Sequence, residues 1–367
     1  MSGILNRPVS PAHPDVTLGF AGAGDLPAVG EFLRGLAGPH FEERFPGLAP
    51  KDFYRWKYLD NPLGEAVVGV AMAAGRPVST VAAVPKRLQA GADTLTAYEL
   101  GDFLTDEAYR RRGLFSRLVE MVCSEAARRK ADLVYVRAND NSFPILVKHL
   151  GFSEPIRLQV RRYLALGRAL THRYGVPERL VRLSGLDRLS QLALSGPPMR
   201  RLAVERVQRF GQATDELWER VRGDYPFLLV RDSEYLNWRF ARSPTPYRLW
   251  VVRRHGVVGG FLVAFVSPRT AAAYVMDLFT ARRDHAAARS LVRACFRGLL
   301  QEGVRTIYTW TAEDRTGTAS DRALRRACMW GMGPPLHVAV RLLNASRTAR
   351  RLSAQASHLS AGDFDGG

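Results

Sequence analysis

The 367-residue sequence has little cysteine and no long apolar segment. Its three cysteines, Cys123, Cys295 and Cys328, lie far apart and include no CxxC pair, which indicates neither a zinc site nor a disulfide framework. The longest apolar run, VVGGFLVAFV at 257–266, is too short to cross a bilayer. The opening residues MSGILNRPVSPAHPD lack the pattern of a secretory leader. We therefore expect a cytoplasmic protein without a transmembrane segment.

Acidic residues are in deficit: 35 Asp and Glu face 53 Lys and Arg, which gives a net charge of +18. This excess favours an anionic partner, such as a phosphorylated cofactor, an acidic carrier protein, nucleic acid or a membrane surface, and it argues against a polycationic substrate. Because much of the excess is arginine, a GC-rich genome would produce it as well. The eight histidines form no HExxH or similar spacing, so we expect no metal.

The sequence contains two related halves about one domain length apart. Each half begins with an aromatic–tryptophan–basic element, FYRWKYLDNP around Trp56 and EYLNWRFARSP around Trp238. Each continues with a β-hairpin pattern, a strand with a central acid (AYELGDFLT at 97–105, AYVMDLFT at 273–280), an amphipathic helix, a buried strand and a short helix. This order predicts two copies of one α/β (α+β) fold. For the tryptophan elements we favour a role in the core over a role in an acceptor site.

These landmarks predict the domain organisation. It consists of a flexible N-terminus at 1–15, a first domain at 16–165, a basic amphipathic helical connector at 166–200, a second domain at 201–345 and a disordered tail at 346–367. The connector repeats leucines between arginines, a pattern that can lie on a membrane surface. We favour packing on a neighbouring domain instead.

The stretch YRRRGLFSRLVEMV, which starts at Tyr109, joins the acid-bearing strand directly to a helix. A helix N-terminus has free N–H groups and a positive dipole end, so it suits an anion. Gly113 allows successive N–H groups to face one point, and the arginines add bidentate donors. The alternative is an exposed arginine run at an ordinary helix start. The sequence has no GxxxxGK[ST] motif, and GFAGAG at 19–24 lacks the GxGxxG spacing.

In this context the loop resembles the [QR]-x-x-G-x-[GA] signature of the GNAT superfamily of N-acetyltransferases, with Arg110 first, Gly113 fourth and Phe115 in place of the usual small residue. DLVYVRANDNSFPILVKHLGF and VTLGFAGAGDLPAVGEFLRGL resemble two further elements of the superfamily. The resemblance covers 16–165, and 201–345 repeat the layout more weakly. It implies two tandem GNAT-like domains, each with a mixed, largely antiparallel sheet flanked by helices.

The resemblance also implies a coenzyme site. The acetyl-CoA pyrophosphate would lie on the backbone N–H groups of 111–116, and the pantetheine arm between splayed strands at 99–105 and 133–138. The implied cofactor-binding residues are Phe103, Leu104, Thr105, Arg110, Arg111, Arg112, Gly113, Leu114, Phe115, Ser116 and Asn141. Asn141 could instead cap the helix that starts at Ser142 or Phe143.

The second half departs from the signature, because ARRDHAAARSL at 281–291 has no glycine. Without that glycine the backbone cannot easily form the anion-binding curl. We therefore expect no CoA in the second half, which would serve as a scaffold that completes the acceptor pocket.

Amine acylation requires a group that accepts a proton from the ammonium. By the resemblance, Glu99 stands where many members carry a glutamate base, and desolvation would favour that role. Asp102 is the second candidate. For each, the alternative is a strand carboxylate paired with an arginine. The general acid stays unassigned: Val147 stands where many members have a tyrosine.

Three functions are compatible with the sequence. The leading prediction is an N-acetyltransferase that moves an acetyl group from acetyl-CoA to a primary amine of a small molecule by direct attack. The second is an acyltransferase that uses a longer acyl-CoA or an acyl group on an acidic carrier protein. The third is a non-catalytic GNAT-like protein that binds an acidic partner. Because aromatic and basic residues do not alternate along the strands, we expect no specific nucleic-acid ligand.

Overall fold

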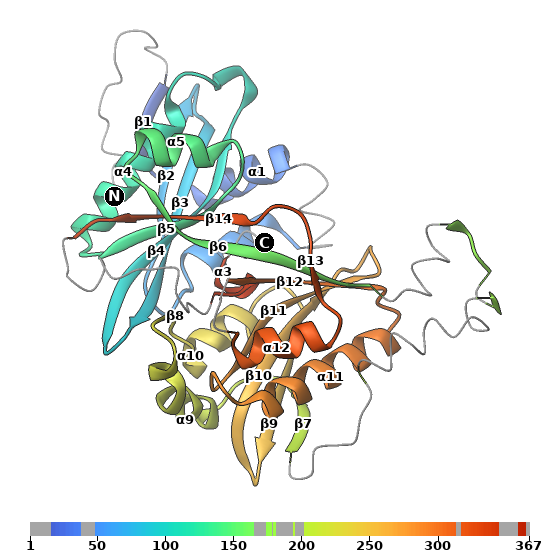
Figure 1. Ribbon diagram of the computed structural model, residues 1–367. Coiled ribbons are helices and arrows are strands. Elements are labelled where there is room, and N and C mark those ends of the chain that lie inside the picture. Colours follow the sequence, from blue (N-terminus) through green and yellow to red (C-terminus); the bar gives the residue numbers. More distant parts are fainter. Residues whose placement is uncertain are drawn as a thin grey trace. The chain divides into compact units, whose positions relative to one another are not determined.

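The computed structural model is a mixed α/β structure with largely antiparallel strand pairing and flanking helices (Figure 1). It describes residues 16–37, 48–164, 174–177, 179–180, 194, 202–312, 317–344 and 359–364. Contacts divide the chain into two compact units: unit 1 is Met1–Ile156, Leu336–Ser353 and Phe364–Gly367, and unit 2 is Arg157–Pro335 and Ala354–Asp363. The predicted fold class is confirmed. The predicted N-terminus at 1–15 and most of the connector at 166–200 lie outside the described residues.

Unit 1 holds one sheet in the order β1-β2-β3-β4-β5-β14. All neighbours pair antiparallel except β4 and β5, which are parallel. Its elements are β1 (Val16–Phe20), α1 (Leu26–Ala37), α3 (Pro50–Tyr58), β2 (Val67–Ala73), β3 (Arg76–Ala90), β4 (Asp93–Thr105), η1 (Glu107–Tyr109), α4 (Leu114–Arg128), β5 (Leu133–Ala138), α5 (Ser142–His149), the start of β6 (Ser153–Leu164) and β14 (Leu336–Leu342).

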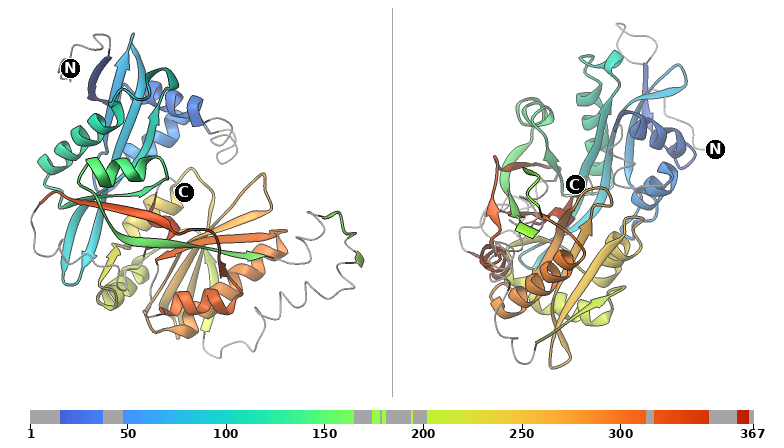
Figure 2. Two further views of the ribbon diagram at one scale, coloured as in Figure 1. Left: turned by 45° about the horizontal axis from the view of Figure 1, so that its top comes forward. Right: turned by 90° about the vertical axis from the view of Figure 1, so that its right-hand side faces the viewer.

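Helix α4 covers one face of this sheet, and α1 and α3 cover the other (Figure 2). Leu114, Leu118 and Val122 recur at the spacing of one helical face and are buried, which explains why this stretch forms an amphipathic helix. On β2, a Cβ atom at Gly69 would lie 2.8 Å from Val122 Cγ2. Only glycine therefore allows α4 to approach the sheet this closely.

Unit 2 holds the sheet β6-β12-β11-β10-β9-β7, in which only β11 and β12 are parallel. Its further elements are β7 (Leu202–Val207), α9 (Gln212–Val221), η2 (Arg222–Asp224), β8 (Phe227–Leu229), α10 (Ser233–Leu236), the π-helical turn η3 (Asn237–Ala241), β9 (Tyr247–Arg254), β10 (Val257–Val266), β11 (Ala272–Thr280), α11 (His285–Gln301), β12 (Thr306–Ala312), α12 (Ala319–Arg326), β13 (Trp330–Gly331) and η5 (Ala361–Asp363).

Two hydrophobic clusters cover the faces of the unit 2 sheet. Along β10, Leu262 belongs to the cluster with α11, whereas Phe261 and Val263 belong to the cluster with α9. This alternation is the period of two expected of a strand that is buried on both faces. Trp238 is 1% exposed and Trp56 of unit 1 is 7% exposed, so both repeated tryptophans are core residues, the role that we favour from the sequence.

The last strand of each sheet comes from the other half of the sequence (Figure 1). In unit 1, β14 pairs with β5 from His337 opposite Ala138 to Leu342 opposite Leu133. In unit 2, residues Leu158–Leu164 of β6 pair with β12. The predicted boundaries at 16–165 and 201–345 follow the order of elements along the chain, whereas the compact units exchange these final strands.

Part of the stretch expected to form a disordered tail is packed. Leu359, Ser360, Ala361, Asp363 and Phe364 are each at most 6% exposed. The rest of that stretch beyond Asn344 lies outside the described residues. Within the part of the chain that the structure describes, no helix is long and apolar enough to span a bilayer.

Candidate active site

Strands β4 and β5 pair over a short length and then diverge. Their register joins Ala97 to Leu133 and ends where Glu99 meets Tyr135, although β4 continues to Thr105 and β5 to Ala138. We call these strand ends, which no longer pair with each other, the β4–β5 divergence. Beyond Glu99, β4 stays paired with β3 on one edge, while no strand in the described part of the chain pairs with its other edge. The backbone groups of its other edge can therefore pair with an extended ligand.

A β-bulge lies at the start of this divergence. Thr80 pairs with Leu104 and Ala82 with Gly101, so Asp102 and Phe103 together oppose one residue of β3. Asp102 has a φ of 50°, in the left-handed region that L-residues rarely adopt. Residues 101–105 are partly exposed, whereas residues 97–100 are buried. The predicted cofactor residues Phe103, Leu104 and Thr105 thus lie on the accessible end of β4.

The Asp102 carboxylate anchors the end of α3. Its Oδ2 accepts hydrogen bonds from Lys57 Nζ at 2.7 Å and Tyr58 Oη at 2.5 Å. Lys57 is 2% exposed, so its ammonium depends on this partner. Burial, and then the Asp102 charge, raise the pKa of Tyr54 on the same helix. Lys57 and Tyr58 belong to the tryptophan element, and sequence reasoning missed their link to Asp102.

Glu99, the first candidate base, is 5% exposed. Its Oε2 lies 3.3 Å from Nζ of Lys86, whose side chain is fully buried on β3. This ion pair involves a lysine, whereas the partner considered from the sequence was an arginine. The ammonium stabilises the charged carboxylate, which can accept a proton. Tyr135, in register with Glu99, packs edge-to-face on Phe364 with ring centroids 5.9 Å apart.

The arginine-rich loop curls at two left-handed residues. Arg111 has φ 61° and Gly113, at the N-cap of α4, has φ 72°. Nothing lies within 4 Å of a Cβ atom added at Gly113, so glycine is required there for its conformation and not for space. Among the described residues, none accepts a hydrogen bond from the backbone N–H groups of residues 111–116. This is the backbone arrangement of an anion-binding nest.

The side chains of the loop differ in availability. Arg110 Nη1 lies 2.8 Å from Glu107 Oε1, and its Nε donates to the Thr105 carbonyl at 3.3 Å. The Arg112 guanidinium stacks over the Tyr109 ring at 4.9 Å. Arg111 is exposed. Of the three predicted phosphate donors, two are therefore already engaged within the loop.

Three other predicted cofactor residues have clear structural places. Leu114 is 4% exposed and packs in the core, and Ser116 is partly buried on the first turn of α4. The Phe115 ring packs edge-to-face on Phe103 with centroids 5.1 Å apart. This contact between α4 and β4 explains why a large residue replaces the usual small one.

Asn141 is exposed at the N-cap position of α5, but its side chain makes no capping bond. Asn139 fills that role, because its Oδ1 accepts from the N–H groups of Asn141 at 3.1 Å and Ser142 at 2.9 Å. The two asparagines flank Asp140 in one NDN stretch, and the sequence offered no signal to choose between them.

Unit 2 repeats the strand arrangement but not the loop. The pairing of β11 with β12 ends where Val275 meets Thr309, a second divergence. At the start of α11, however, the N-cap is Asp284, whose Oδ1 accepts from the N–H of Ala287 at 3.0 Å. A carboxylate thus caps this helix, whereas the N-cap of α4 is a glycine, the first turn of α4 holds no acidic residue, and its N–H groups have no acceptor in the described part of the chain.

Among the described residues, no group of three or more His, Cys, Asp or Glu side chains could hold a metal ion. The polar groups of the unit 1 site are backbone N–H groups, the buried Glu99 carboxylate, the partly buried Asp102 carboxylate and their lysine partners.

Comparison with known proteins agrees with this geometry. Residues 40–150, which include α3, the β4–β5 divergence and the Gly113 loop, match the family model of the acetyltransferase (GNAT) domain. The sequence matches no curated protein.

Solved structures share the fold at low sequence identity. N-myristoyltransferase of Saccharomyces cerevisiae, with bound myristoyl-CoA, is 11% identical, with a TM-score of 0.62 over 97% of this chain and 92% of that chain. A protein of unknown function from Enterococcus faecalis V583, described as a probable N-acyltransferase, is 11% identical, with a TM-score of 0.59 over 89% and 72%. A GCN5-related N-acetyltransferase from Anabaena variabilis ATCC 29413 is 11% identical, with a TM-score of 0.59 over 90% and 73%.

Proposed function

We propose that the chain is an acyl-CoA-dependent N-acyltransferase that binds its donor in unit 1. The observation that carries the proposal is that two features lie side by side along β4 and α4. The Gly113 loop presents N–H groups without an acceptor among the described residues. In the same described part of the chain, no strand pairs with the β4 edge beyond Glu99 that faces the β4–β5 divergence. A coenzyme with a pyrophosphate and an amide-containing arm needs both.

In this proposal the pyrophosphate accepts hydrogen bonds from the N–H groups of residues 111–116, with Arg111 as the exposed guanidinium beside them. The pantetheine amides pair with β4 near Phe103 and Thr105. Asn141, which is exposed at the start of α5, is a further candidate residue to contact the pantetheine arm. The N-terminal position of the site agrees with the family match at 40–150.

We propose acetyl-CoA as the donor and a primary amine of a small molecule as the acceptor. Glu99 accepts a proton from the ammonium, and the resulting amine attacks the thioester carbonyl carbon. A backbone N–H of β4 stabilises the oxyanion. The intermediate collapses as the C–S bond breaks. The nitrogen releases its second proton to solvent, and the thiolate takes a proton from solvent. Asp102 is less suited to be the base, because Lys57 and Tyr58 both donate to it.

A longer acyl chain is the second candidate donor. The observation that favours it is the likeness to N-myristoyltransferase, which covers 97% of this chain and so includes both units. The net charge of +18 would also suit an acyl group on an acidic carrier protein. If neither donor reacts, the protein would be a GNAT-like binder of an acidic partner, and its binding would fall steeply with salt.

Calorimetry with CoA tests the site. Gly113→Glu forces a side chain into a left-handed position and places a negative charge at the proposed anion site, so we expect CoA affinity to fall at least about 100-fold. Gly24→Glu is the matched control, because Gly24 also has nothing within 4 Å and no positive φ. Equal CoA affinity of the two variants would contradict the assignment of the pyrophosphate to the Gly113 loop.

A second experiment identifies the reaction. The protein is incubated with acyl-CoAs of increasing chain length and a mixture of amine metabolites, and the products are read by mass spectrometry. Acetylated amines are the expected products, and preference for long chains would replace acetyl-CoA by the second candidate. CoA binding without any product would favour the non-catalytic protein.

A further inference from the structure

The β11–β12 divergence of unit 2 holds a segment of the same chain. Ser360 forms an antiparallel bridge with Thr311 of β12, and Ala312 N–H donates to the Leu359 carbonyl at 3.3 Å. The bridged residue Thr311 lies past Thr309, where the pairing of β12 with β11 has ended. The segment Leu359–Asp363, which we call the C-terminal segment, thus pairs with a strand edge whose counterpart in unit 1 has no strand partner among the described residues.

A buried arginine recognises the carboxylate of this segment. Arg231 Nη2 lies 2.8 Å from Asp363 Oδ1 and 2.9 Å from Oδ2, and Arg231 is 1% exposed. Asp363 Oδ2 also accepts from the N–H of Ser360 at 2.7 Å. One carboxylate therefore closes the turn of the segment and binds the guanidinium.

The arginine is held in place without the segment. Its Nε donates to Asp277 Oδ2 at 2.8 Å, and its Nη1 donates to the Leu229 carbonyl at 2.9 Å. Asp277 is the acid of the repeated strand, at the position that Asp102 has in unit 1. Removal of Asp363 would therefore leave Arg231 paired and oriented, which is the property of a preorganised binding site.

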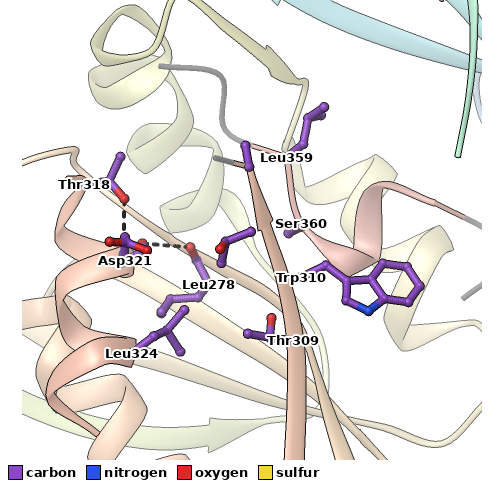
Figure 3. A pocket seen from close by; sticks show the side chains of 11 residues that line it. Leu278, Thr309, Trp310, Thr318, Asp321, Leu324, Leu359 and Ser360 are labelled. Carbon is purple, nitrogen blue, oxygen red and sulfur yellow. Dashed lines mark hydrogen bonds between the residues drawn. The ribbon is translucent and has the colours of Figure 1, made fainter. Parts of the chain in front are cut away.

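A pocket remains open beside the C-terminal segment (Figure 3). Leu359 and Ser360 lie on one side of it, and Thr318, Asp321 and Leu324 of the α12 region lie on the other. The partly exposed Trp310 also lines it. Leu359 and Ser360 border this pocket although each is at most 6% exposed.

We propose that the β11–β12 divergence is a binding site for an acidic peptide, and that the C-terminal segment is its resident ligand. The peptide backbone pairs with β12 while the Asp363 carboxylate binds Arg231. This inference assigns a binding role to the half that lacks the glycine loop. It is independent of acyl transfer, and no coenzyme is used to test it.

The test uses a chain that ends at His358 and a fluorescent peptide of residues 357–367. Circular dichroism and thermal unfolding first establish that the shortened chain is folded. We expect saturable binding in fluorescence anisotropy, and a loss of about tenfold or more in affinity for the peptide with Asp363→Asn. Asp365→Asn, the same change two residues away, is the matched control and should bind like the parent peptide. No binding, or equal binding of both variant peptides, would overturn the proposal.

A measurement on the full chain covers the case in which the shortened chain does not fold. Hydrogen exchange of the Ala312 amide, which donates to the Leu359 carbonyl and not to Asp363, is compared in the Asp363→Asn and Asp365→Asn variants. Faster exchange in the Asp363→Asn variant, but not in the Asp365→Asn variant, would support the proposal that the C-terminal segment can leave the site. A shortened chain that cannot fold, together with unchanged exchange in Asp363→Asn, would show that the segment is an integral part of the fold, and the proposal would be wrong.

Discussion

Lys57 Nζ lies 2.7 Å from Asp102 Oδ2, and this ion pair joins the end of α3 to the bulge of β4. The lysine side chain is 3% exposed and the aspartate side chain 16%. A pair with this little access to water is costly to break from one side, because the remaining charge keeps its desolvation penalty. The conformation of the bulge and the position of α3 are therefore energetically linked.

Lys57→Met removes the buried ammonium and should lower the free energy of unfolding by about 2–3 kcal/mol. Chemical denaturation followed by fluorescence measures this change. Arg55→Met on the same helix is the control: its pair with Asp60 at 3.8 Å is exposed, so the expected loss is below about 0.5 kcal/mol. Similar losses in the two variants would contradict the importance of the buried pair.

Glu99→Gln should lower kcat about 100-fold or more at neutral pH and leave the affinity for CoA nearly unchanged, because the amide cannot accept the proton. Lys86→Met is the companion variant. The Lys86 ammonium stabilises the Glu99 carboxylate, so its removal should shift the acidic limb of the pH–rate profile to higher pH. A profile that neither variant changes would remove Glu99 from the mechanism.

The cysteines should differ sharply in reactivity. Burial raises the pKa of the Cys123 thiol to about 12 and also raises the pKa of Cys295, whereas Cys328 is exposed. At pH 8 the two buried residues therefore stay protonated and inaccessible. We expect Cys328 alone to react with a disulfide reagent in the native protein, and Cys328→Ser to abolish that reaction. A second thiol that reacts at the native rate would contradict the described burial.

The exchange of final strands predicts how the halves behave when separated. Residues 1–156 alone would leave the β5 edge without β14, and exposed strand edges promote aggregation. We expect this fragment to be insoluble, and the same fragment with residues 333–344 attached through a glycine–serine linker to be soluble and to unfold cooperatively. The control is the same fragment and linker followed by residues 333–344 in scrambled order. Equal solubility of all three would show that β14 is dispensable.

Much of the fold could be predicted because its signals are local. The apolar spacing of α4, the glycine before it and the acid-bearing strand all lie within one continuous stretch, Tyr98–Val122. The exchange of β6 and β14 could not be predicted, since both strands carry similar alternation and pairing depends on contacts far apart in the sequence. The C-terminal segment escaped notice because LSAGDF contains small and polar residues that resemble a linker.

The ion-pair partners of the two candidate carboxylates could not be predicted. Lys57 and Lys86, which pair with the two candidate carboxylates, belong to other elements, α3 and β3. Nothing in the sequence next to either acid indicates these partners. The choice between Asn139 and Asn141 depended on the backbone geometry of one turn. The roles of Glu99 and Asp102 in catalysis stay predictions.

The Asp284 carboxylate at the start of α11 has a consequence for unit 2. Glycine at that position would remove both the internal acceptor and the negative charge, yet the stretch around Ser360 would still cover the neighbouring strand edge. If the donor binds in unit 1 as proposed, unit 2 would need two separate changes to bind one as well, a glycine in place of Asp284 and removal of the segment that covers β12. A substitution at Asp284 therefore cannot by itself turn unit 2 into a second donor site.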